Sequence, residues 1–392
     1  MMFMVTSTII FCFLFSVTTA CGMPRDLRRA PRKTAITNVH VFDGNGFGPL
    51  STVVVSGNVI SNANSFGADV VDGGGGYLLP GFIDTHCHVT SCSYLDTMLK
   101  YGITTALDMG TFPYSTLAAC KMSGKTDVRG TGAAGTVDGT ALSMAPGFPP
   151  ESFIDSPEAA RKFVDARVAE GADYIKLFLD PLGPDLESLI AAVEAAHQKG
   201  KLVISHATSQ ALWTTAEEAG VDIPCHTPLD KPIDAAFIDQ YRDTLSHVVP
   251  TLIMMQSIVN NTGAPAQAYT AAAEGSVTNL HKAGVTNLHK AGVTILAGSD
   301  ANTVPFVPAN PPFGDSLHDE LELLVRAGLS PADALRGATS LAASSFGFHD
   351  RGQIKMGYRA DLVLLGADPT TNIQNSRSIK KVWAAGVQSN MS

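Results

Sequence analysis

The sequence lacks an excess of positive charge: 27 Lys and Arg stand against 36 Asp and Glu among 392 residues, which gives a net charge of −9. Binding of nucleic acid depends on clustered Lys and Arg, so we expect no nucleic-acid partner. The one basic cluster, residues 25–33, precedes the first strand pattern and is interpreted as a solvated leader. The composition is otherwise that of an ordinary globular protein, with 45% hydrophobic and 16% charged residues.

Cysteine is scarce, and its spacing fits none of the familiar cysteine motifs. The sequence has no C-x-x-C pair, and the spacing is not that of a disulfide framework. Cys87 and Cys225 lie in apolar, strand-like runs, where a small buried side chain is the expected role. The six cysteines are Cys12, Cys21, Cys87, Cys92, Cys120 and Cys225.

The apolar stretch at the start of the sequence is too short to span a bilayer. Residues 9–17 instead resemble the hydrophobic region of a signal peptide, and the small residues Thr18 and Ala20 precede a cleavage point at Cys21. We therefore predict a signal peptide over residues 1–20, no stable membrane insertion and a secreted protein. The alternative is a cytoplasmic protein whose true start is Met23.

Two kinds of sequence pattern divide the rest of the chain. Residues 35–72 alternate short β-rich runs with turns, which predicts an antiparallel β unit, and similar short runs return after residue 350. We predict that residues 35–79 and 350–388 together form a small β-sandwich domain built from both chain ends.

Over residues 80–349, apolar strand-like runs alternate with amphipathic helical patterns, several of which end in glycine, a common helix stop. Eight strands that alternate with helices predict an α/β fold, a (β/α)8 TIM barrel of parallel strands. The predicted strands are residues 82–89, 104–109, 128–133, 174–179, 202–206, 221–226, 248–254 and 293–300.

Side chains that can bind metal gather at the ends of these strands. His86 and His88 end the first strand, and their spacing by two points both side chains to the same face. Active sites of such barrels lie at the carboxyl ends of the strands. We therefore predict that six residues face one mouth and form a metal site: His86, His88, Lys176, His206, His226 and Asp300.

Each of these residues taken alone has a simpler explanation, except for Lys176. An ammonium buried in an apolar strand without a partner costs several kcal/mol, so Lys176 needs a specific role. A single His in a strand, by contrast, is usually a core or rim residue. The His residues that we interpret in that way are His40, His197, His247, His281, His289, His318 and His349.

The motifs around the six residues resemble those of the metal-dependent amidohydrolase superfamily, over about residues 35–388. The segment "LLPGFIDTHCHV" matches the family's Pro-Gly-Phe-Ile-Asp-x-His-x-His motif, and "ADYIKLF", "ISHA", "IPCHT" and "LAGSDA" match its later elements. The run "LHDELELLVRAGLSPADALRGATSLAA" is similar to the branch that contains imidazolonepropionase-like enzymes, ochratoxinase-type amidases and prolidase-like dipeptidases. The resemblance implies the same barrel with a small β domain.

Carried over to this chain, the resemblance implies a binuclear centre. His86 and His88 would bind the more buried ion, and His206 and His226 would bind the more exposed one. Asp300 would contact the buried ion and a bridging hydroxide, take the proton of that hydroxide and deliver it to the leaving amine.

The same resemblance implies that Lys176 is carboxylated by CO₂ and bridges both ions. Carboxylation turns a buried cation into an anion that is paired with metal, and it needs the neutral amine that desolvation favours. Imidazole suits zinc, so we expect two divalent ions, Zn²⁺ ahead of Mn, Fe or Co. Two ions about 3.5–4 Å apart can lower the pKa of a shared water toward about 7.

We therefore expect a hydrolase that cleaves an amide or another C–N bond of a small molecule, such as an N-acyl amino acid or a dipeptide. Three alternatives remain: a decarboxylase or isomerase that uses the same metal centre, a hydrolase of a cyclic amide or imidazolone, and a non-catalytic binding protein. The oligomeric state, including a homo-oligomer, stays open.

Two Pro-rich loops, residues 136–153 and 301–314, would overhang the mouth. Neither contains Arg or Lys, so a substrate carboxylate must be held by other groups. The loops are either stiff packing loops or the walls of a partly apolar pocket, and Trp213 either lines that pocket or caps its helix. Their aromatic residues are Phe148, Phe153, Phe306 and Phe313.

Residues 277–284 and 285–292 are identical in sequence. Only the second copy runs directly into the last predicted strand, so we predict that the site needs one copy and that the other can be removed. Gly284 and the β-branched residues after it favour a bend at this point.

Overall fold

The computed structural model describes residues 32–121, 124–262, 277–305 and 307–390. Residues 32–392 form one compact unit. The predicted signal peptide, residues 1–20, lies outside the described residues, as does Phe306. Within the described part of the chain, no helix combines the length and the apolar character that crossing a membrane requires.

Strands from both chain ends pair in one seven-stranded sheet, in the order β15-β14-β13-β4-β1-β2-β3. The pairs are antiparallel except β1 with β4, which run parallel. The prediction of an antiparallel unit is wrong for that pair, because β2 occupies one edge of β1 and the chain returns along the other. The pairing gives one sheet, and the predicted sandwich is not confirmed. The strands are β1 Lys33–Phe42, β2 Phe47–Ser56, β3 Val59–Ser61, β4 Asp69–Pro80, β13 Leu362–Leu365, β14 Ile379–Ala384 and β15 Val387–Gln388.

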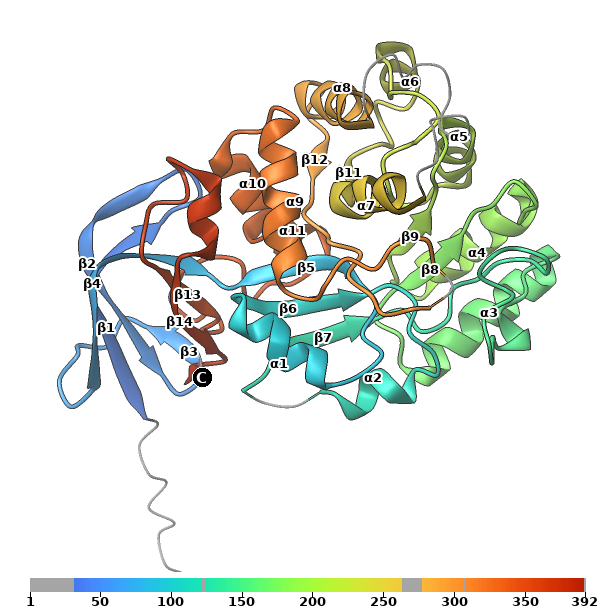
Figure 1. Ribbon diagram of the computed structural model, residues 1–392. Coiled ribbons are helices and arrows are strands. Elements are labelled where there is room, and N and C mark those ends of the chain that lie inside the picture. The colour runs from blue at the N-terminus through green and yellow to red at the C-terminus, as the bar shows by residue number, and fades with distance from the viewer. Residues whose placement is uncertain (1–31, 122–123, 263–276, 306, 391–392) are drawn as a thin grey trace, which may run out of the picture. The chain divides into compact units, whose positions relative to one another are not determined.

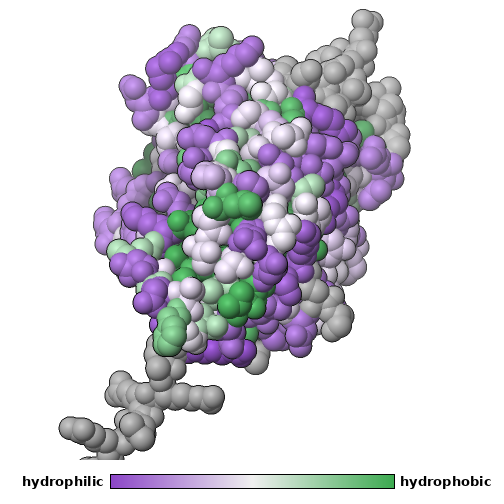
Figure 2. All heavy atoms as spheres, turned by 90° about the vertical axis from the view of Figure 1, so that its left-hand side faces the viewer, coloured by the Kyte–Doolittle hydropathy of each residue, from purple (hydrophilic) through white to green (hydrophobic). Residues whose placement is uncertain are grey.

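Figure 2 shows a face of the molecule on which hydrophobic residues lie apart from one another within a mostly hydrophilic surface. Among the described residues, Leu50 is 56% exposed and Val387 is 53% exposed, and both belong to the seven-stranded sheet. Single exposed apolar residues are normal on soluble proteins and identify no partner. The prediction of a homo-oligomer therefore stays a prediction.

The remaining strands pair only in parallel, in the sheets β5-β6-β7, β8-β9-β10 and β11-β12. Single parallel bridges join Gly135 to Leu177, Cys225 to Val249 and Cys87 to Ala301, so the order follows the chain and returns to β5. This confirms a mixed α/β fold, whereas the closed barrel stays a prediction because regular pairing is interrupted at the three joins. The strands are β5 Phe82–Cys87, β6 Ile103–Asp108, β7 Asp127–Gly130, β8 Ile175–Phe178, β9 Val203–His206, β10 Ile223–Cys225, β11 His247–Val248 and β12 Thr294–Ile295.

Helices follow the parallel strands and flank them in Figure 1. Ser156, Asp185 and Ser209 cap α3, α4 and α5 by accepting a backbone N–H with the side chain, and Gly171 and Gly220 end α3 and α5 at positive φ. The helices are α1 Ser93–Lys100, α2 Ser115–Ala119, α3 Pro157–Glu170, α4 Leu186–Gln198, α5 Gln210–Ala219, α6 Ala235–Gln240, α7 Leu252–Thr262, α8 Val277–Lys290, α9 Asp315–Arg326, α10 Pro331–Gly337 and α11 Ser340–Ser345.

The last two predicted strands of the parallel series are too long. β11 ends at Val248, and α7 begins at Leu252, inside the range predicted as strand. Pro250 has no N–H for a strand ladder, and Thr251 turns the chain at φ 46°. β12 ends at Ile295, and residues 296–300 belong to no strand.

A disulfide joins Cys92, directly before α1, to Cys120, directly after α2, with 5.1 Å between the Cα atoms. The sequence spacing had excluded a disulfide framework, and for this pair that expectation is wrong. The two cysteines are 28 residues apart and are brought together only by the fold. Cys87 and Cys225 are free and buried, which confirms their predicted role.

Candidate metal centre

The first predicted ligands lie where β5 ends. His86 is the fifth residue of β5 and is 1% exposed, and His88 follows the strand. Asp108, buried at the end of β6, accepts the backbone N–H groups of Val89 at 2.6 Å and Thr111 at 2.8 Å. The carboxylate thus fixes the loop that carries His88 against the neighbouring strand.

Asp300 is held against β5 by backbone hydrogen bonds. Its N–H donates to the His86 carbonyl at 2.7 Å, and the His88 N–H donates to the Ala301 carbonyl at 2.9 Å. Asp84 in β5 adds a side-chain connection, because its carboxylate accepts the Ser299 N–H at 3.0 Å and the Ser299 hydroxyl at 2.6 Å. These bonds place the Asp300 carboxylate beside the two His rings.

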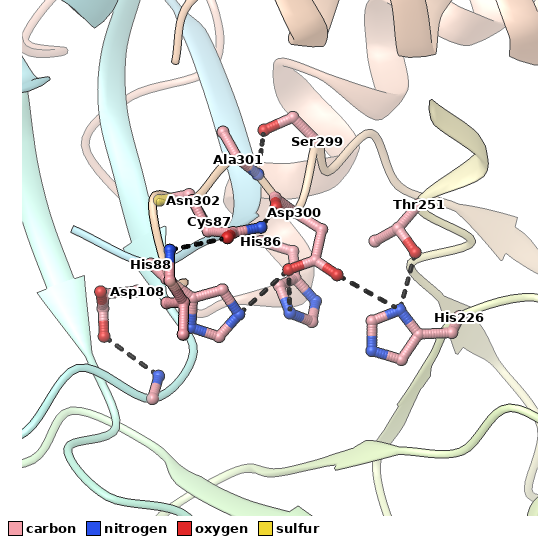
Figure 3. Close-up of polar contacts among 12 residues, drawn as sticks. His86, Cys87, His88, Asp108, His226, Thr251, Ser299, Asp300, Ala301 and Asn302 are labelled. Carbon is pink, nitrogen blue, oxygen red and sulfur yellow. Dashed lines mark hydrogen bonds and ion pairs between the residues drawn. The ribbon is translucent and has the colours of Figure 1, made fainter. Parts of the chain in front are cut away.

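The side chains converge as Figure 3 shows. Asp300 Oδ1 lies 3.0 Å from His88 Nε2 and 3.5 Å from His86 Nε2, and Asp300 Oδ2 lies 3.8 Å from His226 Nδ1. One ligand atom from each of His86, His226 and Asp300 lies within 4.8 Å of the others. All three residues are buried, so the group is of a size and chemistry that could hold a metal ion.

His226 follows β10 and is supported by two side chains, one directly before α7 and one in α5. Its ring Nδ1 lies 2.7 Å from Thr251 Oγ1, and its carbonyl accepts the indole N–H of Trp213 at 3.0 Å. Trp213 also donates to the Ala207 carbonyl at 3.0 Å and is fully buried in α5. Trp213 therefore neither lines a pocket nor caps its helix; it binds the backbone beside two predicted ligands.

The other two predicted residues lie close by. His206 ends β9, and its ring centroid is 4.4 Å from that of His226. Lys176 in β8 is 3% exposed, and its Nζ has no hydrogen-bond partner within the described residues. Burial lowers the pKa values of His86, His206 and His226 most, and the charge of Lys176 lowers them further, so Lys176 is within electrostatic reach of all three. The structure thus brings the six predicted residues together, whereas their roles as ligands stay predictions.

Burial sets the protonation of the site. It lowers the pKa of His206 to about 3, and it holds the pKa values of His86 and His226 well below the ordinary range. His88 differs: burial opposes its charge, yet the hydrogen bond to Asp300 raises its pKa. Burial also lowers the pKa of Lys176. Three neutral imidazoles can offer lone pairs, as metal ligation requires.

Two observations test whether the site fits metal ions. His86 Nδ1 and Lys176 Nζ are buried without hydrogen-bond partners among the described residues, although unpaired buried polar atoms are costly. The donor set of imidazoles and a carboxylate is one that zinc and similar divalent ions accept. The residues present therefore fit a metal centre.

Backbone strain is concentrated at this site. Five non-glycine residues of the described chain have positive φ, and three of them are His226 at 74°, Thr251 at 46° and Asp300 at 54°. Such conformations cost free energy and persist only where surrounding contacts hold them, which is common at functional sites.

The sequence prediction missed the residues that support the ligands. These residues are Asp84, Asp108, Thr251 and Ser299, whose contacts are described above. Asp84 stands inside the quoted "FIDTH" motif and Ser299 inside "AGSDA", so proximity to a motif is a signal that could have identified both. Thr251 carries no such signal, because it is 25 residues from His226 in the sequence.

The sequence left two roles open for the aromatic residues of the two predicted overhanging loops: packing, or lining a partly apolar pocket. Phe313 is 6% exposed and stacks on Tyr94 with ring centroids 4.2 Å apart, so it is a packing residue. Phe148 contacts Phe112 and Phe153 with centroids 5.7 and 5.5 Å apart, and all three rings are partly exposed. Because these three rings are partly exposed, the prediction of a partly apolar pocket stays a prediction.

Comparison with known proteins adds a family and a set of similar folds. The profile of the amidohydrolase family matches residues 77–388. Adenine deaminase 2 of Desulfotalea psychrophila is 39% identical over 71 residues, which is 18% of this chain and 11% of that protein. The chain thus matches only about a tenth of that curated relative's length.

Three solved structures are similar over nearly the whole chain. A Xaa-Pro dipeptidase with bound methionine has a TM-score of 0.78 and 20% identity, covering 91% of this chain and 100% of that one. A protein from Bifidobacterium longum that is described as a prolidase has a TM-score of 0.76 and 25% identity, covering 92% of this chain and 95% of that one. Ochratoxinase of A. niger has a TM-score of 0.75 and 20% identity, covering 91% of this chain and 95% of that one. At 20% identity the likeness shows the fold.

Proposed function

This chain belongs to the amidohydrolase family, and from that premise we propose that it is a metal-dependent hydrolase of a C–N bond in a small molecule. The observation that supports the proposal best is the convergence of His86, His226 and Asp300, with ligand atoms within 4.8 Å of one another. The similar dipeptidase, prolidase and ochratoxinase structures agree with hydrolysis of this kind.

We propose that the centre holds two divalent ions, with Zn²⁺ as the first choice. His86, His88 and Asp300 would hold one ion, and His206 with His226 would hold the other. Ions bound in this way supply Lewis-acid activation of water and of the scissile carbonyl.

Lys176 would join the two ions as a carbamate. CO₂ adds to the neutral amine, and the amine loses a proton, so the buried cation becomes an anion. Burial lowers the pKa of Lys176, which favours the neutral amine, and Nζ has no hydrogen-bond partner among the described residues that would compete.

Asp300 is the group that we propose to move the proton. Its carboxylate would accept a proton from the attacking water and deliver it to the leaving nitrogen, as general base and then general acid. Its backbone is fixed to β5 on both sides, by its own N–H to the His86 carbonyl and by the His88 N–H to the Ala301 carbonyl. A fixed carboxylate needs little reorganisation between the two proton transfers.

Our proposal for the substrate class starts from the loops that follow the eight parallel strands. These loops contain one Lys or Arg, which is Lys231. The ranges are residues 88–92, 109–114, 131–156, 179–185, 207–209, 226–234, 249–251 and 296–314. Lys231 is exposed and makes no ion pair or hydrogen bond with the described residues. We propose that it binds the free carboxylate of a dipeptide or N-acyl amino acid.

Turnover of a panel of dipeptides, N-acyl amino acids and lactams by metal-loaded protein tests the function. Product masses that show addition of water to a C–N bond support hydrolysis, whereas loss of CO₂ or an unchanged mass would replace it with decarboxylation or isomerisation. Metal analysis should give about two ions per chain, since two-metal sites activate water in this way. A reconstituted protein that binds no metal would end the proposal.

The substrate class has its own test in Lys231→Ala. A hydrogen bond to a charged group is worth about 1.5–3 kcal/mol, so KM should rise about tenfold or more for substrates with a free carboxylate, while kcat changes little. The same substrates with a carboxamide should show no change. Lys290→Ala, an exposed lysine at the end of α8, is the matched control. An equal effect on carboxylate and carboxamide would reject this role.

The predicted secretion also remains a proposal. Disulfides persist in oxidising compartments and are rare in the cytosol, so the Cys92–Cys120 disulfide supports export rather than the cytoplasmic alternative.

A further inference from the structure

A buried carboxylate outside the six predicted ligands requires an explanation. Glu320 lies in α9 and is fully buried. Its Oε2 accepts the backbone N–H of Ile253 at 2.8 Å, and its Oε1 has no hydrogen-bond partner within the described residues. Burial raises the pKa of Glu320 to about 8, which shows how unfavourable the charged form is in this place. A carboxyl group in such a position is costly to keep without a specific role.

The N–H that Glu320 binds belongs to the first turn of α7. Ile253 is the second residue of that helix, and Thr251 directly precedes the helix. The Thr251 carbonyl accepts the N–H groups of Met254 at 3.1 Å and Met255 at 3.2 Å. Fixing the start of α7 therefore also fixes the backbone of Thr251.

Thr251 is strained and touches a predicted ligand. Its φ of 46° is unfavourable for a β-branched residue, so the surrounding contacts must maintain it. Its Oγ1 lies 2.7 Å from His226 Nδ1. When Nδ1–H donates to this oxygen, the lone pair of the ring is on Nε2, and both the tautomer and the ring orientation are set.

We propose that Glu320 is a positioning residue for His226: it anchors the start of α7, which keeps Thr251 in the conformation that orients the His226 ring for metal. This inference rests on the proposed metal-dependent function. Within the described residues, no hydrogen bond or ion pair joins Glu320 to a predicted ligand, so we infer that its effect passes through Thr251.

The effect should be confined to one of the two ions. His86, His88 and Asp300 are held by backbone bonds between β5 and residues 299–301 and by Asp84, and none of those bonds involves α7. His226 is the predicted ligand that contacts Thr251. Loss of Glu320 should lower the binding affinity for the ion held by His206 and His226 and leave the affinity for the other ion unchanged.

The experiment titrates metal-free protein with Co²⁺, followed by visible absorption, and measures bound metal by elemental analysis. Wild type should bind two ions, and Glu320→Ala should bind one of them about 10–100-fold more weakly, the usual effect of removing an outer-shell partner. Glu320→Gln should stay close to wild type, because its amide oxygen can accept the same N–H. Glu320→Asp, which keeps the carboxyl group but shortens the reach, should fall between them and gives the answer if the Ala variant does not fold.

Glu322→Ala is the matched control. Glu322 lies one half-turn further along α9 and pairs with Arg377, away from α7. Its loss should leave the binding of both ions unchanged, although it removes an ion pair from the same helix.

A double-mutant cycle separates positioning from a general loss of stability. Thr251→Val removes the hydroxyl that binds His226 and should weaken the same ion. If Glu320 acts through Thr251, Glu320→Ala should add less than twofold to the effect of Thr251→Val. Full additivity of the two effects overturns the proposal, and so does wild-type binding of both ions by Glu320→Ala. A wild-type protein without metal would instead refute the proposed function itself.

Discussion

The two halves of the predicted centre are supported in different ways. His86, His88 and Asp300 are joined by backbone hydrogen bonds between β5 and residues 299–301, with the Asp84 carboxylate across the same joint. His226 has one such backbone bond, from its N–H to the Val249 carbonyl at 2.9 Å, and its other supports are side chains. These are the Thr251 hydroxyl and the Trp213 indole, which come from the start of α7 and from α5.

The difference bears on how each half responds to change. Backbone bonds between strands form together with the core of the fold. A change in the first half should therefore lower both the free energy of unfolding and the affinity for metal. Side-chain contacts from helices can be removed one at a time, so the second half should lose metal affinity in small steps. Each prediction below tests one side of this comparison.

The largest expected effect is that of Asp300→Asn in the first half. Asn keeps the shape and an oxygen ligand but cannot accept a proton, so kcat should fall by about 10²–10⁴ for a lost general acid–base group. The measurement is turnover together with metal content. A variant with full turnover and bound metal would remove Asp300 from the proton pathway.

Asp84→Asn tests the side-chain clamp of the same half. Asp84 accepts both the N–H and the hydroxyl of Ser299, and an amide can accept only on one side, so one buried donor loses its partner. The cost should be about 1–3 kcal/mol of unfolding free energy, measured on metal-free protein in denaturant.

Ser299→Ala serves as the control for that variant, since it removes the hydroxyl donor and leaves the carboxylate in place. Metal titration of Asp84→Asn should show a lower affinity for the ion at His86 and His88 and an unchanged affinity for the other ion. Stability equal to wild type in Asp84→Asn would show that the backbone bonds alone hold this half.

The same comparison explains how much could be predicted from the sequence. The ligands themselves were predictable, because His and Asp at strand ends are recognisable by residue type and spacing. Asp84 and Ser299 are 215 residues apart, and Glu320 and Ile253 are 67 apart, so their pairing exists only once the chain is folded. The Cys92–Cys120 disulfide was missed for the same reason.

Strand boundaries show the same limit at shorter range. The apolar run over residues 248–254 predicts a strand, yet Thr251 turns the chain and α7 begins at Leu252. Leu252 and Met255 are buried in this helix, and a short apolar run fits a buried strand as well as a buried helix, so hydrophobicity alone could not distinguish the two here.

Trp213→Phe tests the helix support of the second half with a smaller change. Phe keeps an aromatic ring in the core of α5 but lacks the N–H that binds the Ala207 and His226 carbonyls. We expect a loss of about 1–3 kcal/mol in unfolding free energy, from the unpaired carbonyls, and a weakened ion at His206 and His226.

Trp383→Phe is the control for this change. Trp383 is equally buried but lies in β14 of the seven-stranded sheet, so its replacement should cost stability without altering metal binding. Equal metal affinities in the two Phe variants would show that the indole hydrogen bonds do not position His226.

The smallest effect is expected from deletion of residues 277–284, the first copy of the duplicated octapeptide. α8 continues through Gly284 and ends at Lys290, inside the second copy. The described packing comes from the second copy: Val285 and Leu288 are fully buried, and the Asn287 side chain donates to the Ile233 carbonyl at 2.9 Å. The second copy also leads directly into β12. Because α8 contacts α7, a deletion that leaves turnover, both ions and thermal stability unchanged would show that the support of His226 is local to α5, α7 and α9. Selective loss of the ion at His206 and His226 would extend that support to the whole helix layer, and loss of the ion at His86 and His88 would contradict the separation of the two halves.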